Sequence, residues 1–233
     1  MADTKRSFIS NILFKTKDVF LKHNTKKTVL VKVLTFALIF TVVMLIVFLL
    51  RNRFAPFVTE ALVLNPNLGV HVENSGFINI FLIFNTGIGF GNLAEQTGAV
   101  YFLQTLIMMI IIIWLLFVDT PDYIVFLSLI VSGSFANIMD RASSLNTFGI
   151  ANAVLDYFQF WFGGAIFNFA DSCIVVGFID IVITYVVRLI IQTRNDAKDR
   201  KQEQDKAQRE KQNQTTANST IEKAPKIDHD VFA

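Results

Sequence analysis

Four long apolar stretches constrain this chain of 233 residues more than any other feature. The first runs from Val33 to Leu50 and contains no charged residue. As a helix rising about 1.5 Å per residue it spans about 27 Å, enough to cross a hydrocarbon core. The other three are of similar length: Tyr101–Val118, Tyr123–Met139 and Asp171–Ile191. Lipid offers no hydrogen bonds to a backbone, so such stretches must be helical. The sequence therefore predicts an all-α membrane protein with four transmembrane helices.

The composition excludes several other classes of protein. Apolar residues make up 53% of the chain and charged residues 17%, which is too apolar for disorder and for an ordinary soluble domain. The single cysteine, Cys173, allows no intrachain disulfide, and we expect it to be buried. A net charge of +2 is too small to indicate nucleic-acid binding. No motif points to a metal ion or an organic cofactor.

Lys and Arg gather at the two ends of the chain. Residues 1–32 hold eight and residues 192–233 hold nine, whereas loop 51–100 holds two and loop 140–170 holds one. Cytoplasmic segments carry the excess of positive charge, so both termini are expected in the cytoplasm and both long loops outside. We divide the chain into a basic cytoplasmic arm (1–30), a four-span domain (31–191) and a polar cytoplasmic tail (192–233). The tail is expected to begin as a frayed helix and to continue as disorder.

This topology brings polar residues from four segments to the outer end of the spans. Two of them, Asp156 and Asp171, are carboxylates in apolar, aromatic surroundings. Two carboxylates brought together away from water share a proton, because desolvation and mutual repulsion raise one pKa. Such a pair supplies the acid and the base needed to activate water against an amide carbonyl. Helix capping and ion pairing with Arg141 are the alternative explanations for these aspartates.

The same segments carry a family resemblance, which covers roughly residues 31–191. The order, the spacing and the position relative to the four spans resemble the lipoprotein signal peptidases (signal peptidase II). The residues that carry it are Asn85–Phe90, Gly133–Arg141, Val154–Tyr157 and Phe167–Ser172. The resemblance implies a bacterial membrane aspartic endopeptidase that acts on prolipoproteins whose cysteine carries a diacylglyceryl group. It implies cleavage of the signal peptide immediately before that cysteine, in a protein that contacts membrane lipid; we expect a monomer.

The family's site positions map onto seven residues of this chain. The catalytic pair maps onto Asp156 and Asp171, and the residues that bind or orient the substrate map onto Asn85, Gly133, Asn137, Arg141 and Asn168. Asn168 precedes Asp171 by one helical turn and is expected on the same helix face, and Asn137 and Arg141 share a face at i and i+4.

Three of these positions have alternative roles. Arg141 can hold loop carbonyls or a lipid head group. Asn85 begins a turn that either presents an amide to the substrate or is a simple loop corner. Gly133 lets a substrate come close to its helix, or is only a small residue for helix packing.

Two apolar segments are too short to span. Residues 77–84 predict an outer strand or a re-entrant piece, and the family has a small extracellular sheet that cradles the substrate. The aromatic run 157–162 predicts an interfacial helix, with Trp161 at the level of the lipid head groups, acting as a lid or as an anchor.

The chain also departs from the family pattern, and two other functions are alternatives. The outer end of the first span, Val47–Arg53, lacks the acidic residue that family members commonly carry there. Asp180 lies about 13 Å deeper than Asp171 and is not expected to take part in the chemistry. None of the three histidines lies within a span, which argues against a serine intramembrane protease. A small transporter using Asp171, Asp180 and Arg188 is the non-enzyme alternative, although paired repeats and broken helices are absent from the sequence.

Overall fold

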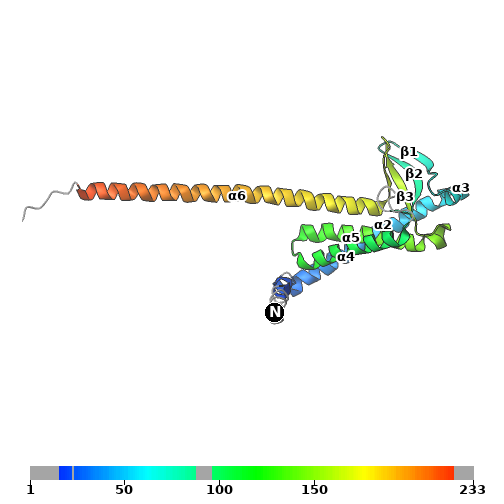
Figure 1. Cartoon of the computed structure of the whole chain (residues 1–233), viewed down its shortest axis with the longest axis horizontal. Coiled ribbons are helices and arrows are strands. Elements are labelled where there is room, and N and C mark those ends of the chain that lie inside the picture. Colours follow the sequence, from blue (N-terminus) through cyan, green and yellow to red (C-terminus); the bar gives the residue numbers. More distant parts are fainter. Residues whose placement is uncertain (1–15, 23, 88–95, 223–233) are drawn as a thin grey trace, which may run out of the picture. The chain divides into compact units, whose positions relative to one another are not determined.

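The computed structural model describes residues 16–22, 24–87 and 96–222. The chain divides into two compact units, the first ending at Ile181 and the second beginning at Val182. Within the described residues, four helices are long and apolar enough to cross a membrane, as the sequence predicted. They are α2 (Lys26–Phe54), α4 (Thr97–Phe117), α5 (Pro121–Phe148) and α6 (Phe169–Glu222). Figure 1 shows these helices with a small sheet at the end of the bundle where α6 begins.

The second unit consists of the later part of α6. The helix continues to Glu222, through a stretch rich in Lys, Arg, Gln and Ala, which are good helix formers. The helix expected from residue 192 is present and extends to Glu222. The disorder expected further on, and the first half of the basic arm, fall on residues 223–233 and 1–15, outside the described residues.

Helix α5 is the central helix of the first unit. In the most apolar 18-residue stretch of α5, 56% is buried, whereas in the corresponding stretch of each of the other three spans 11% is buried. Ser128 and Ser132 are fully buried there and donate hydrogen bonds to backbone carbonyls one turn earlier, so their hydroxyls are satisfied inside the helix. The polar side chains of α5 can therefore be buried without leaving unpaired groups.

Two glycines let α5 and α6 approach closely. A Cβ added at Gly133 of α5 would overlap the carbonyl oxygen of Ala170, and one at Gly177 of α6 would lie 2.7 Å from the carbonyl oxygen of Phe126. Small residues at such contacts allow two helix backbones to pack in direct contact. Gly133 thus has the helix-packing role, the second of the two considered from the sequence.

The sheet contains four antiparallel strands in the order β1-β2-β3-β4. They are β1 (Val70–Ser75), β2 (Ile78–Asn85), β3 (Val154–Phe160) and β4 (Ile166–Phe167). Strand β2 confirms the strand predicted for residues 77–84 and excludes the re-entrant alternative. The central pair β2–β3 is irregular between Ile80 and Ile83, and Ile83 then faces Asp156.

The helix predicted for residues 157–162 is wrong. Residues 157–160 belong to β3, and Trp161 and Phe162 form the turn that follows. A run of aromatic residues is equally suited to a pleated strand, and here the ladder to β2 satisfies its backbone. Sequence periodicity alone cannot separate a short apolar strand from a short helix.

One face of the sheet packs on the helix ends. Phe54 at the end of α2, Leu62 of the short helix α3 (Glu60–Leu64) and Tyr157 of β3 are buried in one apolar cluster with Leu82 and Phe84 of β2. This cluster fixes β3, and with it Asp156, against the end of the helical bundle.

Candidate active site

Asp156 is a buried carboxylate in the middle of the sheet. Only 2% of its surface is exposed, and it lies on β3 opposite Ile83. One oxygen, Oδ2, accepts a hydrogen bond from Asn85 Nδ2 at 3.1 Å, and the other accepts one from Asn168 Nδ2 at 2.8 Å. Both oxygens are therefore held by amides from two different segments.

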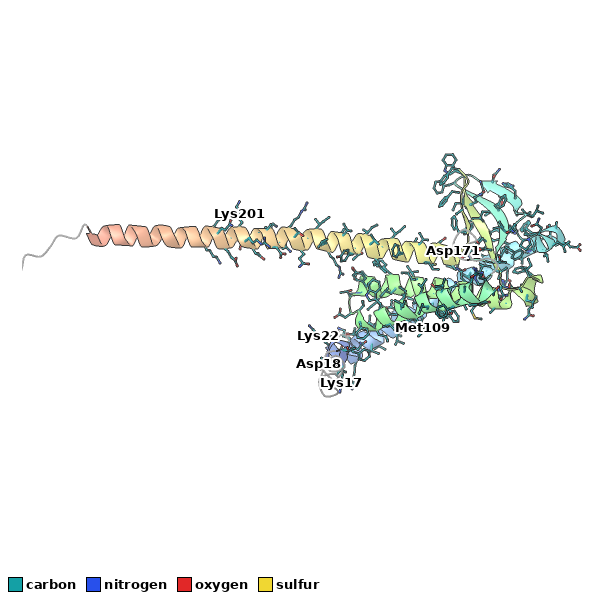
Figure 2. The ribbon with its side chains drawn as sticks, in the orientation of Figure 1. Lys17, Asp18, Lys22, Met109, Asp171 and Lys201 are labelled. Carbon is teal, nitrogen blue, oxygen red and sulfur yellow. The ribbon has the colours of Figure 1, made fainter. Side chains whose placement is uncertain are left out.

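Asp171 lies in the first turn of α6, where Figure 2 labels it. It exchanges two hydrogen bonds with Asn168: the backbone N–H of Asn168 donates to Asp171 Oδ2 at 3.2 Å, and the backbone N–H of Asp171 donates to Asn168 Oδ1 at 2.9 Å. This is the reciprocal pattern of a capping box. Asn168 consequently precedes the helix and caps it, rather than lying on the same helical face as predicted.

Asn137 of α5 joins the two aspartates into one network. Its Nδ2 donates to Asp171 Oδ1 at 2.7 Å, and its Oδ1 accepts a hydrogen bond from Asn168 Nδ2 at 3.1 Å. Asn168 Nδ2 thus donates to Asn137 and to Asp156 at once. Helix capping, one of the alternatives considered for the aspartates, accounts for the position of Asp171 but not for a second, buried carboxylate beside it.

Burial and the neighbouring carboxylate raise the pKa of Asp156. Desolvation is the larger cause, and the negative charge of Asp171 adds to it. The hydrogen bonds from Asn85 and Asn168 and the charge of Arg141 act in the opposite direction but are weaker. Asp156 therefore keeps a proton to a higher pH than an exposed aspartate does.

Arg141 of α5 holds the loops around the site by their backbone. Its guanidinium donates to the carbonyl oxygens of Asn85 and Asn152, both at 3.0 Å, and to that of Gly87. The side chain is 5% exposed. Of the two roles predicted for Arg141, binding to loop carbonyls is the one seen in the structure. It forms no ion pair with Asp156 or Asp171 in the described residues.

The turn that begins at Asn85 is closed by its own side chain. The N–H of Gly87 donates to Asn85 Oδ1 at 3.0 Å, while Asn85 Nδ2 donates to Asp156. This arrangement orients the Asn85 amide toward the carboxylate. The remaining residues of this motif, 88–90, lie outside the described residues.

Three residues that support the site were not found from the sequence. Tyr157 Oη accepts a hydrogen bond from the backbone N–H of Phe169 at 3.1 Å, which fixes the start of α6 to β3. Asn152 has a left-handed backbone (φ 61°), which turns its carbonyl toward Arg141. Ser144 Oγ accepts from the N–H of Ala153 at 3.1 Å. For Tyr157, the position directly after Asp156 was the one feature of the sequence that could have indicated a role at the site.

Next to Arg141, Asp140 belongs to a different network. It accepts a hydrogen bond at 3.0 Å from Arg51 of α2, which also donates to Ser143 and Thr147 of α5 and lies over the ring of Phe148. Arg51 lies in the segment Val47–Arg53, which holds no acidic residue, and its acidic partner comes from α5.

Other residues discussed from the sequence form no hydrogen bond with the two aspartates in the described part of the chain. Cys173 is buried between α2, α5 and α6, as predicted. Asp180 lies nine residues beyond Asp171 on α6 and is half-buried. His71 is in β1, and the other two histidines, His23 and His229, lie outside the described residues.

Several proteins of known family resemble this chain in sequence. A family model described as signal peptidase (SPase) II matches residues 57–187. The lipoprotein signal peptidase of Mycoplasma genitalium is 37% identical over 186 residues, which cover 79% of this chain and 92% of that protein. That of Mycoplasmoides gallisepticum is 38% identical over 194 residues, covering 80% of this chain and 60% of that protein.

A solved bacterial membrane enzyme has a similar fold. It aligns with a TM-score of 0.52 at 23% identity, over 65% of this chain and 87% of its own. The solved structure shows the fold, whereas the family model and the two curated relatives show the family. The chain belongs to the signal peptidase II family.

Proposed function

We propose that this protein is an aspartic endopeptidase that removes the signal peptide from bacterial prolipoproteins, cutting immediately before a cysteine that carries a diacylglyceryl group. Asp156 and Asp171 are the catalytic residues. The observation that carries the proposal is that one residue, Asn168, donates a hydrogen bond to each of the two carboxylates, through its side chain to Asp156 and through its backbone to Asp171.

The pair divides the chemistry between an acid and a base. One carboxylate takes a proton from a water molecule while the water oxygen attacks the scissile carbonyl carbon. The protonated partner donates a hydrogen bond to the carbonyl oxygen. Breaking the C–N bond then requires a proton on the leaving nitrogen, which the pair returns. The products are the signal peptide with a new carboxylate and the lipoprotein with a free amino group on its cysteine. The shared proton belongs to the pair rather than to either residue.

The surrounding residues position the pair and the substrate. Asn137 and Asn168 keep the two carboxyl groups in a fixed geometry through three amide hydrogen bonds. Arg141 holds the 85–87 turn against α5, so that the Asn85 side chain stays on Asp156. Fixed donors of this kind stabilise charge in a transition state without reorganising. Gly133 serves the site indirectly, by allowing α5 to pack against the start of α6.

A cleavage assay with purified enzyme tests the proposal. A prolipoprotein with the diacylglyceryl group on its cysteine is expected to be cut, and the same protein without the lipid is not. Asp156→Asn and Asp171→Asn should each lower kcat by at least about 10³-fold while the protein stays folded. Asp180→Asn is the matched control, with the same change on the same helix, and should keep nearly full activity. Full activity in either site variant would remove the dyad, and complete loss in Asp180→Asn would place the chemistry deeper in the membrane.

We further propose that both termini are cytoplasmic and that the site opens to the outside. The support is the excess of Lys and Arg in the arm and tail over the two long loops. A Leu68→Cys variant in a Cys173→Ala background should react in intact cells with a maleimide that cannot cross the membrane. Leu68 is chosen because it is 54% exposed and precedes β1. Labelling only after the cells are opened would reverse the orientation.

A further inference from the structure

Four aromatic side chains gather at the free ends of the sheet, and the proposed chemistry uses none of them. Phe77, Trp161 and Phe162 are 65%, 62% and 67% exposed, respectively. With the half-buried Phe160 they form a cluster that we call the aromatic tip. Large rings this exposed are unusual in a protein surrounded by water alone, because burying them is strongly favourable.

The strand register explains why these rings meet. Phe160 at the end of β3 pairs with Ile78 at the start of β2, and the backbone N–H of Trp161 donates to the carbonyl of Phe77 at 3.1 Å. The ring centres of Phe77 and Phe160 are 5.8 Å apart, and those of Phe160 and Phe162 are 5.4 Å apart. The tip is therefore a fixed apolar surface built from two turns far apart in the sequence.

The turns that carry the rings are open on their far side. Gly163 and Gly164 adopt positive φ angles, and nothing lies within 4 Å of a Cβ placed on either of them or on Gly76. No charged residue occurs in residues 74–84 or 157–170, which supply these turns. The tip thus presents an uncharged, aromatic surface to its surroundings.

The position of the tip relative to the first turns of α6 identifies those surroundings. Only Asn168 separates β4 from α6, so the sheet begins where this span begins. Figure 1 shows β1, β2 and β3 extending to one side of the helices, with their free ends level with the start of α6 along the helix direction. A surface that stands beside the spans at this level meets the boundary between hydrocarbon and head groups, where Trp and other aromatic side chains concentrate.

We propose that the aromatic tip inserts into the lipid surface at the end of the bilayer where α6 begins. The rings of Phe77 and Phe162 enter the upper acyl region, and the indole of Trp161 lies among the head groups with its N–H toward water. Phe160 is four residues from Asp156 on the same strand, so this contact holds the strand of Asp156 at a constant depth. The inference rests on the spans and the sheet and does not depend on the proposed chemistry.

Tryptophan fluorescence of the full chain in lipid nanodiscs tests the insertion. The chain has two tryptophans, so Trp114→Phe leaves Trp161 as the sole tryptophan, which can be excited selectively at wavelengths that tyrosine does not absorb. Phosphatidylcholine brominated on the acyl chain close to the head group should quench Trp161 at least about twice as strongly as lipid brominated near the chain end. Aqueous iodide should quench it weakly.

A matched control places the indole elsewhere on the sheet. Leu68 is 54% exposed and precedes β1, at the strand end opposite the tip. Leu68→Trp, in a chain with Trp114→Phe and Trp161→Phe, should be quenched by iodide and hardly by brominated lipid.

Two outcomes would overturn the proposal. Iodide quenching of Trp161 equal to that of the Leu68→Trp control, with no effect of brominated lipid, would put the tip in water. Protection of Trp161 from both quenchers would mean that a protein surface covers it instead.

Discussion

Two neighbouring residues near the end of α5, Asp140 and Arg141, enter two polar networks of different kinds. Asp140 pairs with Arg51 of α2, and both side chains keep some contact with solvent (15% and 17% exposed). Arg141 is buried, and its guanidinium donates to backbone carbonyls of the loops around Asp156. One network therefore ties two helices together, while the other shapes the candidate site. A local sequence motif can thus contain residues with unrelated purposes.

Arg141→Lys should cause the largest loss among the supporting residues. A lysine ammonium is compact and cannot reach three carbonyls at once, so the 85–87 turn would shift away from Asp156. We expect kcat/KM for the lipid-modified substrate to fall roughly 10²-fold. The matched control is Arg51→Lys in the other network, which should change kcat/KM less than about threefold. Equal losses in the two variants would erase the distinction between the networks.

Asn168 combines two roles that substitutions can separate. Asn168→Ser keeps a side-chain oxygen to cap α6 but loses the amide that donates to Asp156 and Asn137, whereas Asn168→Ala loses both functions. Both variants should lower kcat at least about tenfold, because the amide no longer holds the carboxylates. Only Asn168→Ala should also lower the thermal unfolding temperature. A Ser variant with normal activity would show that capping alone matters.

The structure brings the predicted site residues together, but it holds them by contacts that the sequence did not predict. The four spans follow from length and hydropathy, and Asp156, Asp171, Asn137 and Asn168 follow from motifs that the family resemblance supplied. Asn168 was nevertheless expected on a helix face, whereas it caps the helix. The apolar pattern could not show this, because the start of a helix is set by its capping contacts. The strand at 154–160 needed its partner β2, about seventy residues earlier in the chain. The Arg51–Asp140 pair joins residues 89 positions apart, a separation that no local pattern reveals.

The raised pKa of Asp156 makes the stability of the fold depend on pH. Above its ordinary value of 3.8 this carboxyl ionises in the unfolded chain while the folded protein keeps it protonated. The folded state then binds more protons, so stability falls as the pH rises from 3.8 toward the raised pKa. Thermal unfolding in detergent should show this decline in the wild type. Asp156→Asn cannot ionise, and its slope over the same pH range should be shallower; an unchanged slope would mean that burial does not perturb Asp156.

Breaking the α2–α5 network should have the smallest effect. Arg51→Gln removes the ion pair with Asp140 and the contact with Phe148, in a partly solvated setting where such pairs contribute about 1 kcal/mol. We expect a slightly lower unfolding temperature and nearly normal cleavage. A double-mutant cycle with Asp140→Asn measures the coupling directly. A large loss of activity with unchanged stability would assign Arg51 to the site instead.

The most direct test of the central claim compares Asp156→Asn, Asp171→Asn and the double variant in one cleavage assay. If the two carboxylates act as a single unit, removing the second after the first costs almost nothing, and all three variants share the same residual rate. Losses that multiply in the double variant, or a single variant that keeps most of its activity, would show that the two aspartates do not work as a pair.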